Sequence, residues 1–428
     1  MARFVRFAVV VWLAVLCFAA EGRAANRLDL VSTRCREVEV PLDATHSSAR
    51  LADCGDDSAE DLLWHLDRID HPDGQLEGTF DRTNRGQGSV VYVMDTGVRA
   101  DHTEFSSASG SRVVAGFDAT RSIHIGNSRC ARGNKALDPC YTDFNELAAA
   151  SHGTGVASLI AGHTVGVASE ALIVSVRVMN EHGLATTRTY LDGLDAIIEH
   201  AWSPAAPRYR TAVVNISGWV LERISQNDPV PTISYATIER KMRDMTGGVD
   251  ASGRPDARGK RFLFVVAGNN LDGGCNRAGF VDRFPAILGP EIDGVITVGG
   301  MTAANGWWAG ACRGGVEVLA PAQSIFSATI TGRDHYRGKK PNLRSGTSFS
   351  APMISGIAAL LLAESPELTP QQLEAIITTT SSRITDPDFD RADGKVACVE
   401  PRPAPTFTAS MHASGFVSVP GRMLESER

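Results

Sequence analysis

Short, wholly apolar runs are the feature that most constrains the fold of this chain. They do not alternate between polar and apolar residues, so each is expected to form a strand buried on both faces, as in a parallel sheet. Helical patterns lie between or after them, as a small-residue segment at 155–161 and an apolar stripe at 190–198. This alternation predicts an α/β fold with three layers, a mostly parallel central sheet and helices on both faces. The predicted strands are residues 90–94, 172–178, 213–217, 262–267 and 295–298.

A further helix start is predicted towards the C-terminal end. Thr369 is suited to cap the helix, Pro370 to occupy its first turn, and Gln372 to complete a capping box. The helical pattern then continues through residues 373–379.

The first residues of the chain have the pattern of a secretory signal peptide. Arg3 and Arg6 precede an apolar run at 7–20, and small residues follow at Gly22 and Ala24. An uncleaved membrane anchor is the alternative, but a run of about 14 residues is short for a span of roughly 20. No later stretch reads as apolar enough to cross a membrane. We therefore expect residues 1–24 to be removed and the mature protein to be secreted, extracellular or periplasmic, without a membrane partner.

The cysteines agree with export. Cys17 would leave with the signal peptide, and an oxidising compartment would allow the remaining cysteines of the eight to pair. Spacing suggests that neighbours pair, although spacing alone leaves the connectivity open. The suggested pairs are Cys35–Cys54, Cys130–Cys140 and Cys275–Cys312, with Cys398 left over.

Two classes of site have no support in the sequence. Neither a CxxC pair nor an HExxH motif occurs, so there is no signature of a metal site. The formal net charge of -7 leaves no basic footprint for nucleic acid. We expect no nucleic-acid partner.

Two motifs hold residues suited to acid–base chemistry. Asp95 follows the first predicted strand, and sites in open α/β sheets form outside the carboxyl ends of strands. His152 opens the small-residue helix, and histidine transfers protons readily near neutral pH. Alone, each has a plain alternative, because aspartate is a common turn residue and His152 is one of eleven histidines. The glycines after His152 resemble a dinucleotide-binding loop, but Ser158 replaces its third glycine.

A third motif leads into an apolar helix and contains Ser348. Because proline is tolerated only in the first turn of a helix, Pro352 is expected there, which places Ser348 near the helix start. The free N–H groups and the helix dipole at such a start favour negative charge. Ser348 could serve simply as a helix cap. As a nucleophile it would need a neighbouring base.

The three motifs together support a catalytic site more strongly than any one of them does alone. Asp95, His152 and Ser348 occur in the order of the subtilisin triad. Asn269 follows the predicted strand at 262–267, again at a carboxyl end, where its amide can donate to an oxyanion. Four such features on suitable elements of one chain are improbable by chance.

The chain resembles the subtilases, and within them the proteinase K and aqualysin group. The resemblance begins at the segment 64–70, similar to the mature N-terminus of that group, and ends at the serine motif. The other segments that carry it are residues 86–88, 91–97, 152–157, 176–178 and 319–321.

This resemblance implies roles for individual residues. Ser348 would attack the peptide carbonyl, His152 would take its proton and pass it to the leaving amine, and Asp95 would orient the imidazole. Asn269 and the backbone N–H of Ser348 would hold the oxyanion. Segment 214–218 resembles the strand that pairs with bound substrate, so the expected substrate-binding residues are Ser217, Gly218 and Trp219. The resemblance also implies a disulfide between Cys275 and Cys312.

Several departures from the family pattern stand out. The segment between Asp95 and His152 is long, and a second insertion covers residues 221–260. Trp219 stands where glycine is usual, which would reshape a substrate pocket. Thr302 replaces a calcium-binding aspartate, so a structural calcium ion has no assignable site, and no cofactor is expected to be required.

The sequence therefore predicts a monomeric, secreted serine endopeptidase that acts on proteins or peptides through an acyl-enzyme, with a subtilisin-like domain at residues 62–428. The alternatives are a processing protease restricted to one partner, and a non-catalytic relative that binds peptides. An esterase is disfavoured because no GxSxG motif occurs.

The short segment at 25–61 is the remaining expectation. It is too small for the folded inhibitory propeptide usual in the family. We expect the active enzyme to retain it, with trimming just before Trp64 as the alternative.

Overall fold

The structure of the chain is a computed structural model. It describes residues 63–70, 76, 79–121, 151–180, 182–221, 233–271, 274–276, 279–337 and 344–383, together with two short strands at 27–29 and 395–396. The expected signal peptide, nearly all of the segment 25–61, and Cys35, Cys54, Cys130, Cys140 and Cys398 lie outside the described residues.

A nine-stranded sheet runs through the domain in the order β14-β15-β11-β10-β9-β8-β3-β7-β6. Neighbours from β15 to β6 are parallel, and the edge strand β14 is antiparallel to β15. The predicted mostly parallel sheet is confirmed. Its strands are β3 (Val90–Asp95), β6 (Val113–Asp118), β7 (Leu172–Arg177), β8 (Thr211–Ile216), β9 (Arg261–Ala267), β10 (Val295–Met301), β11 (Val318–Pro321), β14 (Ser382–Arg383) and β15 (Lys395–Val396).

Short two-stranded pairs lie outside the main sheet. Among the described residues they are β1 (Arg27–Asp29) with β2 (Thr79–Asp81), β4 (Ser106–Ser107) with β5 (Gly110–Ser111), and β12 (Ser327–Ala328) with β13 (Tyr336–Arg337).

The main sheet is buried on both faces because alternate side chains of each strand enter two separate cores. In β3, Val91 and Val93 belong to one core, and Tyr92 and Met94 belong to the other. This explains why the apolar runs in the sequence show no alternation with polar residues.

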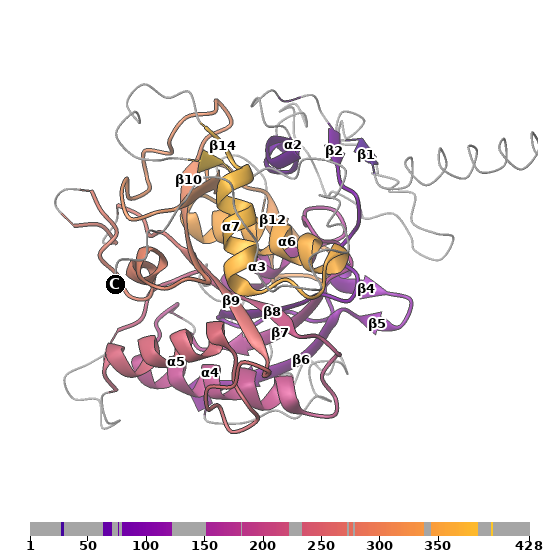
Figure 1. Cartoon of the computed structure of the whole chain (residues 1–428). Helices are drawn as coiled ribbons and strands as arrows, with labels where there is room; N and C mark the ends of the chain where they lie inside the picture. The colour runs from indigo at the N-terminus through magenta and orange to yellow at the C-terminus, as the bar shows by residue number, and fades with distance from the viewer. Residues whose placement is uncertain are drawn as a thin grey trace, which may run out of the picture.

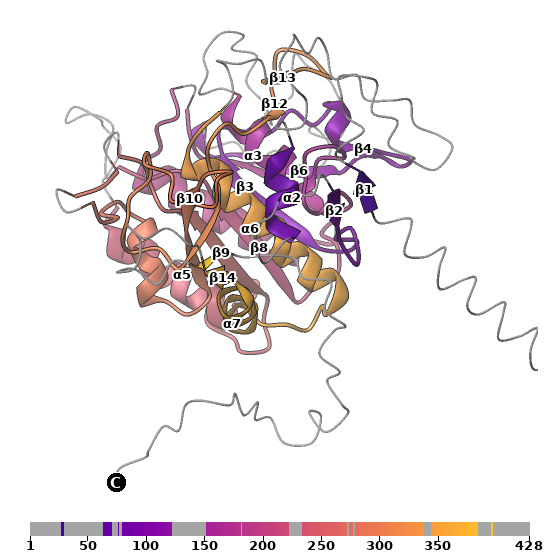
Figure 2. The same ribbon diagram turned by 90° about the horizontal axis from the view of Figure 1, so that it is seen from above.

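Helices form the outer layers of the domain (Figures 1 and 2). α2, α3, α6 and α7 contribute to the core that contains Val91, whereas α4 and α5 contribute to the core that contains Tyr92. The domain therefore has the three layers that the sequence predicts. The helices are α2 (Trp64–Asp70), α3 (His152–Ala161), α4 (Thr187–Trp202), α5 (Tyr235–Gly247), α6 (Thr347–Glu364) and α7 (Pro370–Thr380), with short 3-10 turns η2 (Thr103–Phe105), η3 (Ala119–Arg121) and η5 (Ala286–Glu291).

The predicted capping box at the start of α7 is confirmed. The Thr369 hydroxyl accepts a hydrogen bond from the N–H of Gln372 at 3.2 Å, and the Gln372 side chain accepts one from the N–H of Thr369 at 2.9 Å. α3 begins at His152, as the sequence predicts. α4 extends beyond its predicted apolar stripe and runs from Thr187 to Trp202.

One expectation about membranes needs correction. Among the described residues, one helix, α6, is long and apolar enough to cross a membrane by length and composition. However, 78% of it is buried inside the domain. α6 is apolar around most of its circumference because it lies in the core, packed against both the sheet and α3.

Two carboxyl groups meet beside the first residues of β10 and β11. Glu317 accepts a hydrogen bond from the N–H of Thr297 at 2.9 Å, and Glu374 of α7 accepts one from the N–H of Gly294. The two side chains also hydrogen-bond to each other. Burial raises the pKa of Glu317 to about 8, and the charges of Glu374 and Asp293 add to this rise. Burial raises the pKa of Glu374 as well. At neutral pH the pair therefore shares a proton.

This pair predicts how stability depends on pH. The pKa of Glu317 is higher in the folded than in the unfolded chain, so its contribution is complete at low pH and is lost as pH rises towards 8. Glu317→Gln keeps a neutral donor to Glu374 and removes this loss. Each unit of pKa difference corresponds to about 1.4 kcal/mol, so we expect a gain of at least about 1 kcal/mol at pH 9 and little change at pH 5.

Thermal unfolding at pH 5, 7 and 9 would measure the effect, on a Ser348→Ala background to prevent self-cleavage. Glu364→Gln, at an exposed glutamate, is the matched control and should leave the pH dependence unchanged. The shared-proton interpretation fails if Glu317→Gln and the parent lose stability equally between pH 5 and pH 9.

Candidate active site

Three of the predicted site residues lie at the carboxyl ends of strands in the main sheet. Asp95 ends β3, Ser217 follows β8, and Asn269 follows β9. These strands are parallel neighbours in the order β9-β8-β3, so their carboxyl ends lie side by side. Two further predicted residues belong to helices: His152 is the first residue of α3, and Ser348 is the second of α6.

His152 is held by a buried carboxylate. Its Nδ1 lies 2.9 Å from both carboxylate oxygens of Asp95, which is fully buried, and Oδ1 of Asp95 also accepts the N–H of Thr96 at 2.7 Å. An ionised carboxylate can only accept, so Nδ1 carries the proton and Nε2 is left with a free lone pair. The imidazole keeps partial access to solvent, with 23% of its side chain exposed.

The glycine after His152 permits this close approach. A Cβ atom on Gly153 would lie 2.4 Å from the carbonyl oxygen of Gly97 and 3.0 Å from Oδ1 of Asp95. The N–H of Gly153 is also bound by the Thr96 hydroxyl at 3.0 Å. The Gly-rich sequence here therefore serves helix–strand contact.

Ser348 lies one turn before a proline, and this overturns one detail of the sequence prediction. Pro352 is not in the first turn of α6 but inside the helix. It has no N–H to donate to the carbonyl of Ser348, four residues earlier. That carbonyl accepts instead from the Ser217 hydroxyl, at 2.9 Å. A bond across the site therefore replaces the missing bond within the helix.

Ser217 connects the end of β8 to α6 both as a hydrogen-bond donor and as an acceptor. Its hydroxyl accepts from the Asn215 side chain at 2.9 Å, and Asn215 accepts from the Ser355 hydroxyl at 2.9 Å. The Ser348 hydroxyl in turn donates to the Ser217 carbonyl at 3.2 Å. In this structure the hydroxyl of Ser348 is thus directed at Ser217. The ring of Phe349, the next residue, lies 5.5 Å from that of His152.

Asn269 adopts a left-handed backbone conformation, with φ of 64°, which asparagine tolerates better than most residues. The residue is 3% exposed. The amide nitrogen lies 3.5 Å from the carbonyl of Ala267, a weak bond, and the amide oxygen has no hydrogen-bond partner among the described residues. The amide is therefore only loosely engaged with the protein.

Sequence reasoning missed Asn270, the neighbouring residue. Its side-chain oxygen accepts from the N–H and the hydroxyl of Thr347, at 3.0 and 3.1 Å. Gly346, at the cap position of α6, has no side chain to do this. Asn270 thus supplies the cap from another strand end. Because Gly346 has no side chain that could cap α6, the sequence could have indicated that a residue from elsewhere in the chain provides the cap.

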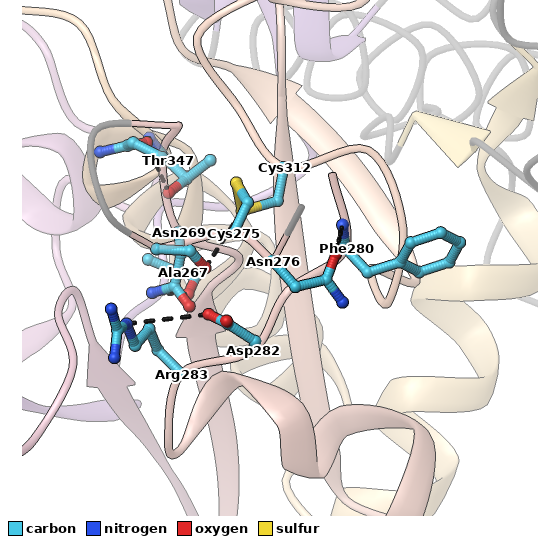
Figure 3. The surroundings of a disulfide bond; sticks show 11 residues. Ala267, Asn269, Cys275, Asn276, Phe280, Asp282, Arg283, Cys312 and Thr347 are labelled. Carbon is cyan, nitrogen blue, oxygen red and sulfur yellow. Dashed lines mark hydrogen bonds and ion pairs between the residues drawn. A yellow bond between two sulfur atoms is a disulfide. The ribbon is translucent and has the colours of Figure 1, made fainter. Parts of the chain in front are cut away.

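A disulfide between Cys275 and Cys312 holds the loop that carries Asn269 (Figure 3). The N–H of Cys312 donates to the carbonyl of Asn269 at 3.3 Å. This confirms the expected pair. A loop closed over a separation of 37 residues should contribute about 4 kcal/mol by the chain-entropy model.

The expected substrate segment is partly accessible. Ser217 is buried and engaged within the protein, whereas Gly218 and Trp219 are partly exposed. A Cβ atom on Gly218 would lie 2.4 Å from the terminal methyl of Met179, so a larger residue would require that side chain to move. After Trp219 the chain pairs again, through the N–H of Val220 and the carbonyl of Phe284 at 3.0 Å.

The described part of the chain contains no group of three or more His, Cys, Asp or Glu side chains that could hold a metal ion. Thr302 lies in a turn, where its N–H donates to the carbonyl of Gly306 at 2.9 Å.

Comparisons with known proteins agree with this geometry. The sequence is 28% identical to the alkaline serine exoprotease A of Vibrio alginolyticus over 335 residues, which are 77% of this chain and 49% of that protein. It is 30% identical to an extracellular serine proteinase of Thermus sp. (strain Rt41A) over 318 residues, 73% of this chain and 60% of that protein. The chain thus spans about half to three fifths of the length of these relatives.

A solved structure of a cold adapted subtilisin-like serine proteinase is also similar. It superposes with a TM-score of 0.55 at 25% sequence identity, covering 79% of this chain and 98% of that one. The model of the subtilase family matches residues 86–396, well over half of the sequence. With the parallel sheet, the His152–Asp95 pair and this match in agreement, the chain belongs to the subtilase family.

Proposed function

We propose that the protein is a secreted serine endopeptidase with Asp95, His152 and Ser348 as its catalytic triad. The observation that carries this proposal is the bond from Nδ1 of His152 to the fully buried carboxylate of Asp95. A buried carboxylate in this position fixes the tautomer and stabilises the imidazolium that forms when His152 accepts a proton.

The reaction would begin with attack of Ser348 Oγ on a peptide carbonyl carbon. Nε2 of His152 takes the hydroxyl proton as the new C–O bond forms, and then gives it to the amine as the C–N bond breaks. Water then attacks the acyl carbon: Nε2 of His152 takes a proton from the water as the new C–O bond forms and gives it to Ser348 Oγ as the ester C–O bond breaks, which releases the acid product. The Ser348 hydroxyl first has to leave its bond to the Ser217 carbonyl, a side-chain rotation between staggered positions.

Two donors would stabilise the tetrahedral oxyanion. The backbone N–H of Ser348 lies in the first turn of α6, where N–H groups have no partner within the helix. The amide of Asn269 is the second donor, since its bond to Ala267 is weak and easily exchanged. The positive end of the α6 dipole adds to their effect.

Peptide substrate would bind as an added strand beside Gly218 and Trp219. No backbone hydrogen bond to another described residue engages either of them. Such binding recognises the extended main chain of a protein or peptide. The indole of Trp219 would narrow the neighbouring pocket for a substrate side chain. The protein would act as a monomer, without a required cofactor, nucleic-acid partner or membrane partner.

Secretion has three supports: the signal-peptide pattern at residues 1–24, the disulfide of Cys275 and Cys312, and the word "extracellular" in the name of the Thermus relative. Disulfides of this kind persist in oxidising compartments.

Replacing the nucleophile tests the triad. We expect Ser348→Ala to lower turnover of a peptide library by roughly 10⁶, the loss known for the nucleophile of subtilisin, and to abolish labelling by a fluorophosphonate. Ser350→Ala, two residues along in α6, is the matched control: it loses a bond to the Pro321 carbonyl and should keep turnover within a few-fold. Undiminished proteolysis by Ser348→Ala would refute the triad, and a wild-type protein inert to both assays would indicate a peptide-binding relative.

Replacing the side-chain donor tests the oxyanion site. Asn269→Ala should lower kcat by roughly 10²–10³, as for the equivalent loss in subtilisin, because one transition-state hydrogen bond is removed. KM should change little. Asn276→Ala, at an exposed asparagine near the same disulfide, should leave kcat unchanged. A kcat of Asn269→Ala within a few-fold of wild type would mean that another group supplies the donor.

A further inference from the structure

A buried arginine connects the starts of the two helices that carry His152 and Ser348. Arg344 is 6% exposed. Its Nη1 donates to the carbonyl of Ser151 at 3.1 Å, and its Nη2 donates to the Ser151 hydroxyl at 2.7 Å. Ser151 is the residue immediately before His152, so both bonds act on the first turn of α3.

The same guanidinium also touches the other helix. Its central carbon lies 5.5 Å from the ring centroid of Phe349, the residue immediately after Ser348. The ring of Phe349 is in turn 5.5 Å from that of His152, tilted by 52°. Arg344 therefore contacts the residue before His152 at the start of α3 and the residue after Ser348 at the start of α6. The ring of Phe349 in turn lies near the imidazole of His152.

The surroundings are shaped for this side chain. A Cβ atom on Gly155 would lie 2.4 Å from Nη1 of Arg344, so a glycine at this position leaves room for the guanidinium. The backbone of Arg344 is anchored in both directions to Ile325, with N···O distances of 3.1 and 2.7 Å. The side chain thus extends from a fixed point into the space beside Gly155, and a larger residue there would displace the guanidinium.

We propose that Arg344 is a positioning residue, which sets the orientation of His152 relative to Ser348 by binding Ser151 and Phe349 at once. The planar guanidinium suits this task because its edge offers two donors while its face contacts an aromatic ring. A lysine ammonium is a single point donor and cannot make both contacts in the same plane. The inference rests on the proposed triad.

The test compares Arg344→Met and Arg344→Lys with wild type, with kcat expressed per active site titrated by a fluorophosphonate. A misplacement of about 1 Å costs roughly 10²-fold in rate, so we expect kcat to fall 10- to 100-fold in both variants while KM stays within about two-fold. The second-order rate of fluorophosphonate labelling of Ser348 should fall in parallel, because that reaction uses the same proton transfer.

Two further variants separate positioning from stability. Ser151→Ala removes the hydroxyl that binds Nη2 and should lower kcat three- to ten-fold; it decides the matter if Arg344→Met does not fold. Arg112→Met, at a buried arginine that binds the carbonyl of Ala161 at the far end of α3, should lower the melting temperature but not kcat per titrated site.

The outcomes are distinct. Unchanged kcat in Arg344→Met and Arg344→Lys, or in Ser151→Ala when the arginine variants do not fold, overturns the proposal. Full restoration of kcat by Arg344→Lys would also overturn it, since charge alone would then suffice. Failure of the triad itself would appear separately, as activity retained by Ser348→Ala.

Discussion

Neighbouring parallel strands have their carboxyl ends on the same side of a sheet, and the candidate site depends on this constraint. β3, β8 and β9 are adjacent and run in one direction, so Asp95, Ser217 and Asn269 are brought together although the sequence separates them widely. The sheet can be parallel throughout its centre because helices cover both faces and remove the strands from water. The two cores that lie on either side of β3 therefore hold the site in place as well as the fold.

The helices that complete the site start under unusual local conditions, and contacts from elsewhere compensate. Pro352 removes a bond from the second turn of α6, and the hydroxyl of Ser217 binds the carbonyl that is left free. Gly346 offers no cap, and Asn270 provides one from the end of β9. Each compensation connects α6 to a strand that carries another site residue. The position of Ser348 is consequently coupled to β8 and β9 more directly than helix packing alone would require.

The fold accommodates buried ionisable side chains in two different ways. Arg344 is 6% exposed, and two of its guanidinium nitrogens bind the carbonyl and the hydroxyl of Ser151. Burying a charge is costly unless its hydrogen bonds are made, so the geometry around Arg344 has to be closely matched. The carboxyls of Glu317 and Glu374 avoid the cost differently, by sharing a proton. The first arrangement lies between the helix starts of the site, whereas the second lies at the opposite ends of β10 and β11.

The layers of the fold and the identity of the residues proposed to act can be read from the amino-acid sequence alone. Apolar runs without alternation indicate strands buried on both faces, and Asp95, His152, Asn269 and Ser348 each stand in a recognisable local motif. Patterns of this kind can be recognised in the sequence because they reflect contacts between residues close in the chain, or the regular spacing of side chains along a helix or strand. The contacts of Arg344 with Ser151 and Phe349, the cap from Asn270 and the shared proton of Glu317 become visible only in the folded chain. These join residues far apart in the chain, and no local period or spacing encodes which distant side chain will lie opposite a free carbonyl or an unfilled space.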